Sequence, residues 1–312
     1  MKRLTPEAFE RARHVLKTQA RPLDWALFEH RFEDAPPLRV IEELAAFQNP
    51  DGGFGHALEP DVRTPSSSAL GTGIALSILK EVQQPAQEPV VVSAVEYLRH
   101  TLNEERQVWR AVPDDVNDHA HAPWWHDENG SLARTFDGFL VMPRAQLVAL
   151  LHHYRERVDH DWLEPLTEAT VADIETANNA VFEGGGDALR YALTLAETDA
   201  VPKHYKDRIL PRLRALADHV VCRAPEDWDT YCATPLKIAP TPDSVVADLL
   251  WDDLQRNLDY VIDHQTDEGA WEPTWTWGDA YPADWEKARR DWHGQLTLET
   301  LTSLEAFGRI DQ

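Results

Sequence analysis

The sequence predicts an all-α protein, and three observations lead to this prediction. Apolar residues recur at helical spacing along most of the chain, as Leu38, Ile41, Leu44 and Ala45 do on one face. No segment alternates convincingly between apolar and polar residues, and the best candidate for a strand is the short stretch QVWRAV, residues 107–112. A phrase of Gln, Gly and an aromatic residue also appears near both ends of the chain, each time after a helical segment.

The predicted helices have ordinary lengths and follow one another closely. The first spans residues 5–19 and opens with Thr5 as a cap before a Pro-Glu start. The segment 66–82 is small or apolar on nearly every side, with Gly71 and Gly73 inside it, which predicts a buried or closely packed helix. The remaining predicted helices span residues 38–48, 88–102, 143–158, 162–177, 186–199, 206–221 and 248–265. Because no flexible linker interrupts them, residues 1–312 are expected to form a single domain.

The composition limits the classes of partner and the compartment. The chain has 30 basic and 54 acidic residues, a formal net charge of −24, which argues against binding nucleic acid or an anionic membrane surface. The N-terminus lacks the apolar core of a signal peptide, and no apolar run reaches the ~18 residues of a membrane span. The only cysteines are Cys222 and Cys232, which fits a reducing compartment. We therefore expect a cytoplasmic protein without a membrane span, whose oligomeric state the sequence does not predict.

The repeated phrase is the strongest sign of internal organisation. QNPDGGF, residues 48–54, and QTDEGAW, residues 265–271, place Gln, Gly and an aromatic ring at the same spacing. In each copy a helix ends at an acidic Gly turn, where the Gln amide can bind neighbouring backbone and the ring can hold the loop against the next helix. Two such copies predict a repeated structural unit.

The phrase resembles the Gln–Gly–aromatic motif of the terpenoid cyclase and protein prenyltransferase superfamily. QNPDGGFG is similar to the repeats of prenyltransferase β-subunits, and QTDEGAW is similar to those of squalene–hopene cyclases. The resemblance implies an α/α toroid, in which inner and outer helices alternate around a central cavity lined by aromatic residues. It also implies an isoprenoid or another apolar small molecule as ligand, although a fold does not by itself determine a reaction.

Polar residues come directly after the first copy of the phrase. His56, Glu59, Asp61 and Arg63 precede the predicted buried helix. We expect them to form a polar cluster at the cavity mouth, with Glu59 or Asp61 as the acid or base. The alternative is structural, with the two carboxylates capping helix ends and pairing with Arg63.

A second polar segment, DHAHAPWWH at residues 118–126, holds three histidines, among them His121, beside Asp118. Imidazole and carboxylate are zinc ligands, so a zinc site is one interpretation. A loop His-x-His without a clear third ligand is more often a hydrogen-bonded surface feature. The adjacent Trp124 and Trp125 either fill the core or wall a ligand pocket.

The densest aromatic run lies in residues 272–301. Trp275 and Trp277 would face one side of an extended loop, and Trp285 and Trp292 would lie two turns apart on a helix. Such a wall suits an apolar ligand or a carbocation held by cation–π attraction, and it equally suits stacked sugar rings. The alternative is ordinary core packing.

The catalytic sets that the resemblance implies match only in part. A class II terpene cyclase carries an acid in a D-x-D-D context, whereas this chain has DWDT at residues 227–230, which makes Asp229 the candidate acid. The zinc ligands of a prenyltransferase would correspond to Asp229, Cys232 and His293, but the first spacing is one residue too long. We therefore expect no cofactor, with zinc as the alternative, and we add Asp279 to the predicted ligand-binding residues.

Three functions fit this sequence. The first is a terpene-cyclase-like protein that binds an isoprenoid or other apolar ligand, with Glu59, Asp61 or Asp229 as acid. The second is a carbohydrate-active (α/α) barrel with paired carboxylates about 5–9 Å apart. The third is a toroid that binds a ligand without catalysis. The sequence does not predict the substrate or the product.

Overall fold

The computed structural model describes residues 1–132 and 141–311, and the chain divides into two compact units. Unit 1 consists of Met1–Glu43, Gly184–Gly186 and Ala217–Gln312, and unit 2 consists of Leu44–Glu183 and Asp187–Leu216. Throughout the described residues the regular elements are helices, joined by loops with a few isolated β-bridges, which confirms the all-α class. The expectation that residues 1–312 form one domain stays a prediction.

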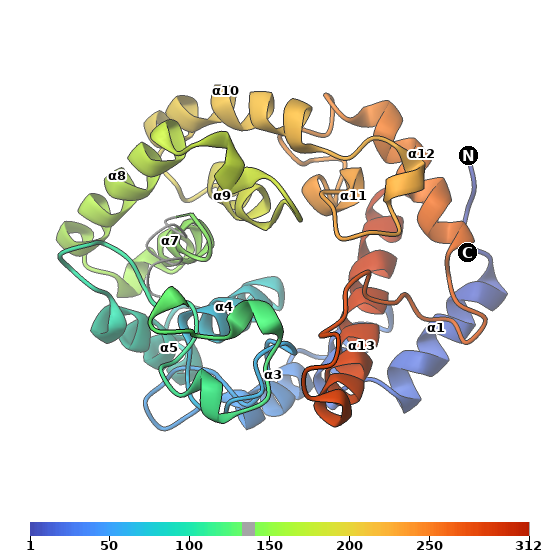
Figure 1. The fold of residues 1–312 in the computed structure, drawn as a ribbon, viewed down its shortest axis with the longest axis horizontal. Helices are drawn as coiled ribbons and strands as arrows, with labels where there is room; N and C mark the ends of the chain where they lie inside the picture. Colours follow the sequence, from blue (N-terminus) through green and yellow to red (C-terminus); the bar gives the residue numbers. More distant parts are fainter. Residues whose placement is uncertain (133–140, 312) are drawn as a thin grey trace. The chain divides into compact units, whose positions relative to one another are not determined.

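Unit 1 is built from both ends of the chain. Its helices are α1 (Pro6–Thr18), α2 (Pro22–Phe32), most of α3 (Leu38–Leu44), α11 (Pro235–Ile238), α12 (Trp251–Asp263) and α13 (Pro282–Ala306), with the 3-10 helix η6 (Pro225–Asp227). Helices α1, α2 and α13 pack on one another, and Figure 1 shows the blue α1 beside the red α13. The predicted cap of α1 is confirmed, because the Thr5 hydroxyl accepts a hydrogen bond from the Ala8 N–H at 3.2 Å.

The two chain ends are joined directly within unit 1. Leu4 and Ile310 form a parallel bridge, and the Leu4 N–H donates to the Arg309 carbonyl at 2.7 Å. The Arg309 side chain is 1% exposed and binds the Asp259 carboxylate of α12 and the Lys2 carbonyl. A buried guanidinium therefore links both termini to α12.

Unit 2 is arranged around helix α7. Its helices are α4 (Ala69–Glu81), α5 (Pro89–Thr101), α7 (Arg144–His153), α8 (His160–Thr176), α9 (Asp187–Glu197) and α10 (Lys203–Val220), whose last four residues belong to unit 1. The short 3-10 helices are η1 (Ala45–Phe47), η2 (Val116–Asp118), η3 (Pro123–Trp125), η4 (Arg155–Arg157) and η5 (Asn179–Phe182). Helix α7 packs against α4, α8 and α9 and is buried along most of its length.

The close packing predicted for residues 66–82 is confirmed in α4. A methyl group on Gly71 would lie 2.7 Å from the Phe54 carbonyl oxygen, and one on Gly73 would lie 3.0 Å from the Leu147 side chain. Glycine at these two positions therefore lets the loop before α4 and helix α7 approach its backbone closely.

One local expectation is corrected. The predicted helix 38–48 ends at Leu44 and continues only as η1, and its buried stripe is Val40 and Leu44, whereas Leu38 is 61% exposed. Residues 107–112, the best candidate for a strand, contribute a single bridge between Asn103 and Val108. No helix in the part of the chain that the structure describes is long and apolar enough to cross a membrane.

Candidate functional site

The first Gln–Gly–aromatic phrase forms a tight turn between η1 and α4. The Gln48 side-chain amide donates to the Gly52 carbonyl at 3.1 Å and to the Ser93 hydroxyl of α5 at 3.0 Å. The Phe54 N–H donates to the Thr72 hydroxyl of α4 at 3.1 Å. Gly52 has a φ of +89°, and a methyl group there would lie 2.9 Å from the Ser93 carbonyl carbon, so both conformation and space require glycine.

The second phrase forms the same turn between α12 and α13. The Gln265 amide donates to the Gly269 carbonyl at 3.0 Å and to the Ala8 carbonyl of α1 at 2.9 Å. The Trp271 N–H donates to the Thr297 hydroxyl of α13 at 3.2 Å. Gly269 also has a positive φ, +106°. The expected repeated unit is therefore present, with matching hydrogen bonds in both copies.

The two turns differ in the helix that completes them. In unit 2 the Gln side chain binds α5, the helix that follows α4 in sequence. In unit 1 the described residues after α13, 307–311, form no helix, and α1 takes the corresponding place. Both α1 and α5 begin with proline, and the Gln binds near that end of each. Unit 1 therefore completes a repeat from the two ends of the chain.

The predicted site residues fall into two groups, one in each unit. In unit 2 the segments around Asp61 and His121 are brought together by a short antiparallel bridge. The Ala122 N–H donates to the Asp61 carbonyl at 2.9 Å, and the Arg63 N–H donates to the Ala120 carbonyl at 3.0 Å. Asp61 is 3% exposed and His121 is 2% exposed, so the bridge holds an acid and an imidazole inside the protein.

His121 is a neutral, hydrogen-bonded imidazole. Its Nδ1 lies 2.7 Å from the His119 carbonyl, and its Nε2 lies 3.1 Å from Nδ1 of His126, whose ring stacks on it. Burial lowers the pKa of His121, with a smaller contribution from His126. If Nδ1–H donates to the carbonyl, Nε2 is left to accept from His126.

The other predicted residues of unit 2 lie around this bridge. Trp125 is 6% exposed and fills the core, whereas the adjacent Trp124 is 46% exposed. His56 is exposed and its Nε2 lies 2.9 Å from the Asn49 amide oxygen, while Glu59 and Arg63 are half-buried. His56 adopts a φ of +54°, a left-handed conformation that is uncommon outside glycine.

In unit 1 three aromatic side chains form what we call the aromatic wall: Tyr231, Trp275 and Trp292. Trp275 meets Trp292 edge to face with ring centroids 4.9 Å apart, and Tyr231 meets Trp275 edge to face at 5.8 Å. The ammonium group of Lys237 lies 4.9 Å from the centre of the Tyr231 ring, a cation–π distance. Both Trp residues are half-buried, and Tyr231 is exposed.

The remaining predicted residues of unit 1 do not join the aromatic wall as expected. Trp277 is 1% exposed, and its ring centroid lies 5.7 Å from that of Trp285. It therefore does not lie on the same side of the loop as Trp275 or contact the same ring. Asp279 is exposed in the turn after Trp277. Asp229 is exposed in the loop after η6, where its charge adds to burial in raising the pKa of Tyr260 on α12.

A polar chain that the sequence reading missed lies beside the aromatic wall. Glu299 is two helical turns along α13 from Trp292 and therefore on the same face. The Gln295 amide donates to the Glu299 carboxylate at 2.9 Å, and the Arg21 guanidinium lies 3.4 Å from the Gln295 amide oxygen. Arg21 also makes two hydrogen bonds of 2.9 Å to Asp24. We call this series, Asp24–Arg21–Gln295–Glu299, the acid chain.

The two carboxylates of the acid chain differ in chemistry. Asp24 is 2% exposed and forms an ion pair with Arg21. Burial, reinforced by the charge of Asp24, raises the pKa of Glu299 against the opposing effects of Gln295, Lys237 and Arg21. The Glu299 side chain is nevertheless exposed to solvent. Of the two, Glu299 is the carboxyl whose pKa is raised, the direction that favours its protonated form.

Neither predicted zinc set is assembled. No three His, Cys, Asp or Glu side chains within residues 1–132 and 141–311 are placed to hold one metal ion. His293 instead lies 3.5 Å from Glu272 and 3.3 Å from Arg289, and the Cys232 thiol bonds to the Asp227 carbonyl.

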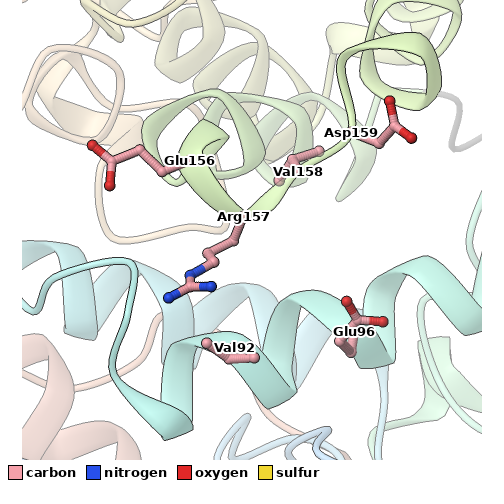
Figure 2. Close-up of a pocket in the computed structure, with 6 residues that line it drawn as sticks. All are labelled: Val92, Glu96, Glu156, Arg157, Val158 and Asp159. Atoms are coloured by element: carbon pink, nitrogen blue, oxygen red, sulfur yellow. The ribbon is translucent and has the colours of Figure 1, made fainter.

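Two shallow surface hollows of about 450 and 480 Å³ occur elsewhere. The first lies in unit 2 between α5 and η4, where Figure 2 shows Arg157 reaching toward Val92 of α5. Its Nε donates to the Ala86 carbonyl at 3.2 Å, so this arginine is occupied in holding the loop. The second lies in unit 1 along α1 beside Glu268. Neither hollow contains a predicted site residue.

No protein-family model, no curated protein and no solved structure matches this chain.

Proposed function

We propose that the protein binds an isoprenoid or a similarly apolar small molecule against the aromatic wall of unit 1, with Glu299 as an acid toward it. The observation that carries this proposal is the edge-to-face Trp275–Trp292 pair, whose Trp292 lies on the same face of α13 as Glu299, a carboxyl whose pKa is raised. Half-buried indole rings offer apolar contact area. Protonation of an alkene requires a proton donor, and the raised pKa of Glu299 favours its protonated form.

The chemistry proposed for this site is proton transfer to a carbon–carbon double bond. Glu299 gives its proton to one alkene carbon, and the other carbon becomes a carbocation while Glu299 becomes a carboxylate. The π faces of Trp275 and Trp292 stabilise the cation. The cation then bonds to a second double bond of the same ligand and finally loses a proton, so no oxidant or metal takes part.

The carbohydrate alternative has one observation in its favour, the polar side chains of the acid chain next to aromatic rings. A glycosidase, however, requires two working carboxylates. Asp24 is buried and fixed by two hydrogen bonds to Arg21, which leaves it unsuited to act as base or nucleophile. We therefore favour the apolar ligand, and binding of a sugar becomes an outcome of the test.

We also propose that the helices form the α/α toroid that the repeated phrase implies. The matching hydrogen bonds of the two Gln–Gly–aromatic turns support it, because each turn joins one helix pair to the next. A crystal structure with inner and outer helices alternating in a closed ring is the expected result, and an open array would contradict it. The two unpaired cysteines support a cytoplasmic location.

The binding proposal is tested by titrating the protein with a C15 isoprenoid alcohol and, separately, with a linear oligosaccharide. Binding is followed by tryptophan fluorescence and by calorimetry. The isoprenoid alcohol is expected to bind and the oligosaccharide is not. Replacing Trp292 by Leu is expected to weaken binding about tenfold or more, since it removes a buried contact of the ligand.

Trp251→Leu is the matched control, because Trp251 is an exposed tryptophan of the same unit whose ring lies 6.1 Å from that of Phe307. It is expected to leave the isoprenoid affinity unchanged. Equal losses in the Trp251 and Trp292 variants, or binding of the oligosaccharide instead, would contradict the proposal.

A further inference from the structure

The only two cysteines of the chain lie close together in unit 1. The Cys222 N–H donates to the Ala233 carbonyl at 2.9 Å, which closes the loop between them. The Cys222 thiol lies 3.8 Å from the Asp227 carboxylate, and the Cys232 thiol lies 3.5 Å from the carbonyl of the same residue. Both thiols therefore lie against the same residue, Asp227. Both are unpaired and half-buried, so a small reagent can reach them.

The loop that carries the cysteines is held in place by its own packing. The Trp228 ring is 3% exposed, and its N–H donates to the Cys222 carbonyl at 2.7 Å. This bond fixes the backbone of Cys222 against the middle of the loop. The bond to Trp228 and the bond from the Cys222 N–H to the Ala233 carbonyl therefore keep the two cysteines close together.

We propose that Cys222 and Cys232 form a reversible disulfide when the protein meets a low-molecular-weight disulfide oxidant. The pair is thus a redox modification site in the loop that carries Tyr231. Because Tyr231 adjoins Cys232 in sequence and packs on Trp275, the new bond would form next to the aromatic wall. The proposal does not depend on what that wall binds.

The oxidation has two balanced steps. The Cys222 thiolate attacks one sulfur of the oxidant, which forms a mixed disulfide and releases one small-molecule thiolate. The Cys232 thiolate then attacks the Cys222 sulfur and releases the second. Two protein thiols lose two protons and two electrons in total, and one oxidant molecule becomes two thiols.

The order of attack follows from the surroundings of Cys232. Burial, together with the neighbouring Cys222, raises the pKa of the Cys232 thiol to about 12. Cys232 is therefore the poorer first nucleophile. Once Cys222 is part of the mixed disulfide, its sulfur can no longer carry a negative charge. One of the causes that raise the pKa of Cys232 is therefore absent during the second step. Oxidation is expected to be slow at pH 7 and to accelerate as the pH rises.

The test is incubation of the native protein with oxidised glutathione at pH 8, followed by denaturation, alkylation of any remaining thiols and mass spectrometry. The expected product has lost two hydrogens, takes up no alkylating reagent and yields the tryptic peptides 215–223 and 224–237 as one cross-linked species. Dithiothreitol is expected to restore two alkylatable thiols.

The single replacements separate the two steps. Cys232→Ser is expected to stop at a glutathione adduct on Cys222, and Cys222→Ser is expected to react several-fold more slowly. The proposal is overturned if the wild-type protein accumulates glutathione on one or both cysteines without the cross-link. It is equally overturned if both thiols stay alkylatable while Cys232→Ser forms the adduct, or if the disulfide joins two chains.

Discussion

Single glycines fix the geometry of both Gln–Gly–aromatic turns. Gly269 combines a φ of +106° with a close approach to α1, because a methyl group there would lie 2.5 Å from the Arg11 carbonyl carbon. Side chains rarely adopt this conformation, and backbone cannot move aside as a flexible side chain can. The glycine is therefore required by the contact between the turn and α1.

Gly269→Ala is expected to lower the free energy of unfolding by about 3 kcal/mol, measured by urea denaturation. Gly278→Ala is the matched control, because Gly278 has a φ of +59° but no atom within 4 Å of the added methyl group. It is expected to cost only about 1 kcal/mol, the conformational part alone. Equal effects of the two variants would show that the close approach to α1 contributes nothing.

The sequence predicted these residues better than it predicted the acid. The Gln, Gly and aromatic positions could be identified because their spacing recurs, and a repeated spacing needs no knowledge of tertiary contacts. Glu299 lies in no motif. Its seven-residue separation from Trp292 was the one available signal. Its pKa is raised by burial and, to a smaller extent, by Asp24, which is distant in sequence.

Helices α7 and α8 are joined by a buried polar contact that makes their packing sensitive to pH. The Thr167 hydroxyl donates to the Leu163 carbonyl at 2.8 Å, so its oxygen accepts from His152 Nε2, 2.9 Å away. Burial, with smaller contributions from Arg155 and His160, lowers the pKa of His152 to about 4. The folded protein therefore holds this imidazole in its neutral form.

This depressed pKa predicts a loss of stability on acidification. The folded-state pKa is below the ordinary value of 6.5, so the unfolded chain binds the proton first as the pH falls. The stabilising contribution of the neutral His152 to the folded state is fully present above pH 6.5. It is lost as the pH falls from 6.5 to 4. It amounts to about 2 kcal/mol between pH 8 and pH 5.

Urea denaturation of the wild-type protein and of His152→Gln at pH 8 and pH 5 checks this prediction. Gln retains a donor for Thr167 but does not titrate, so the variant is expected to lose about 2 kcal/mol less over the same range. Parallel losses in both proteins would show that His152 does not govern the acid sensitivity.

At the scale of elements, the sequence predicted long amphipathic helices and missed one that is buried at consecutive positions. Helix α2 carries buried residues at every position from Leu23 to Phe28, so it shows no period of 3.6. Helix α3 was predicted too long because its apolar spacing continues into the turn, where the Gln48 contacts to Gly52 and Ser93 replace helical hydrogen bonds. In both helices, contacts with distant parts of the chain, rather than the local sequence pattern, determined the structure.

At the scale of the whole molecule, the stability of unit 1 depends on the joined chain ends. Arg309 is buried and binds Asp259 and the Lys2 carbonyl. Removing it takes the charged partner from Asp259, which keeps the Lys2 N–H as a donor, and takes the side-chain donor from the Lys2 carbonyl. Arg309→Met is expected to cost about 3 kcal/mol in urea denaturation. Lys2→Met, which removes the exposed ion pair to Asp263 at the same junction, is expected to cost less than about 0.5 kcal/mol. Similar costs for both would show that the buried guanidinium does not hold the ends.

The central claim is that the aromatic wall of unit 1 binds an apolar small molecule, and native mass spectrometry of the purified protein tests it most directly. The wild-type protein and the Trp251→Leu control, equilibrated with the isoprenoid alcohol, are each expected to carry one added molecule that Trp292→Leu does not retain. A wild-type protein without the adduct, or an adduct held equally by the Trp292 variant, would contradict the claim.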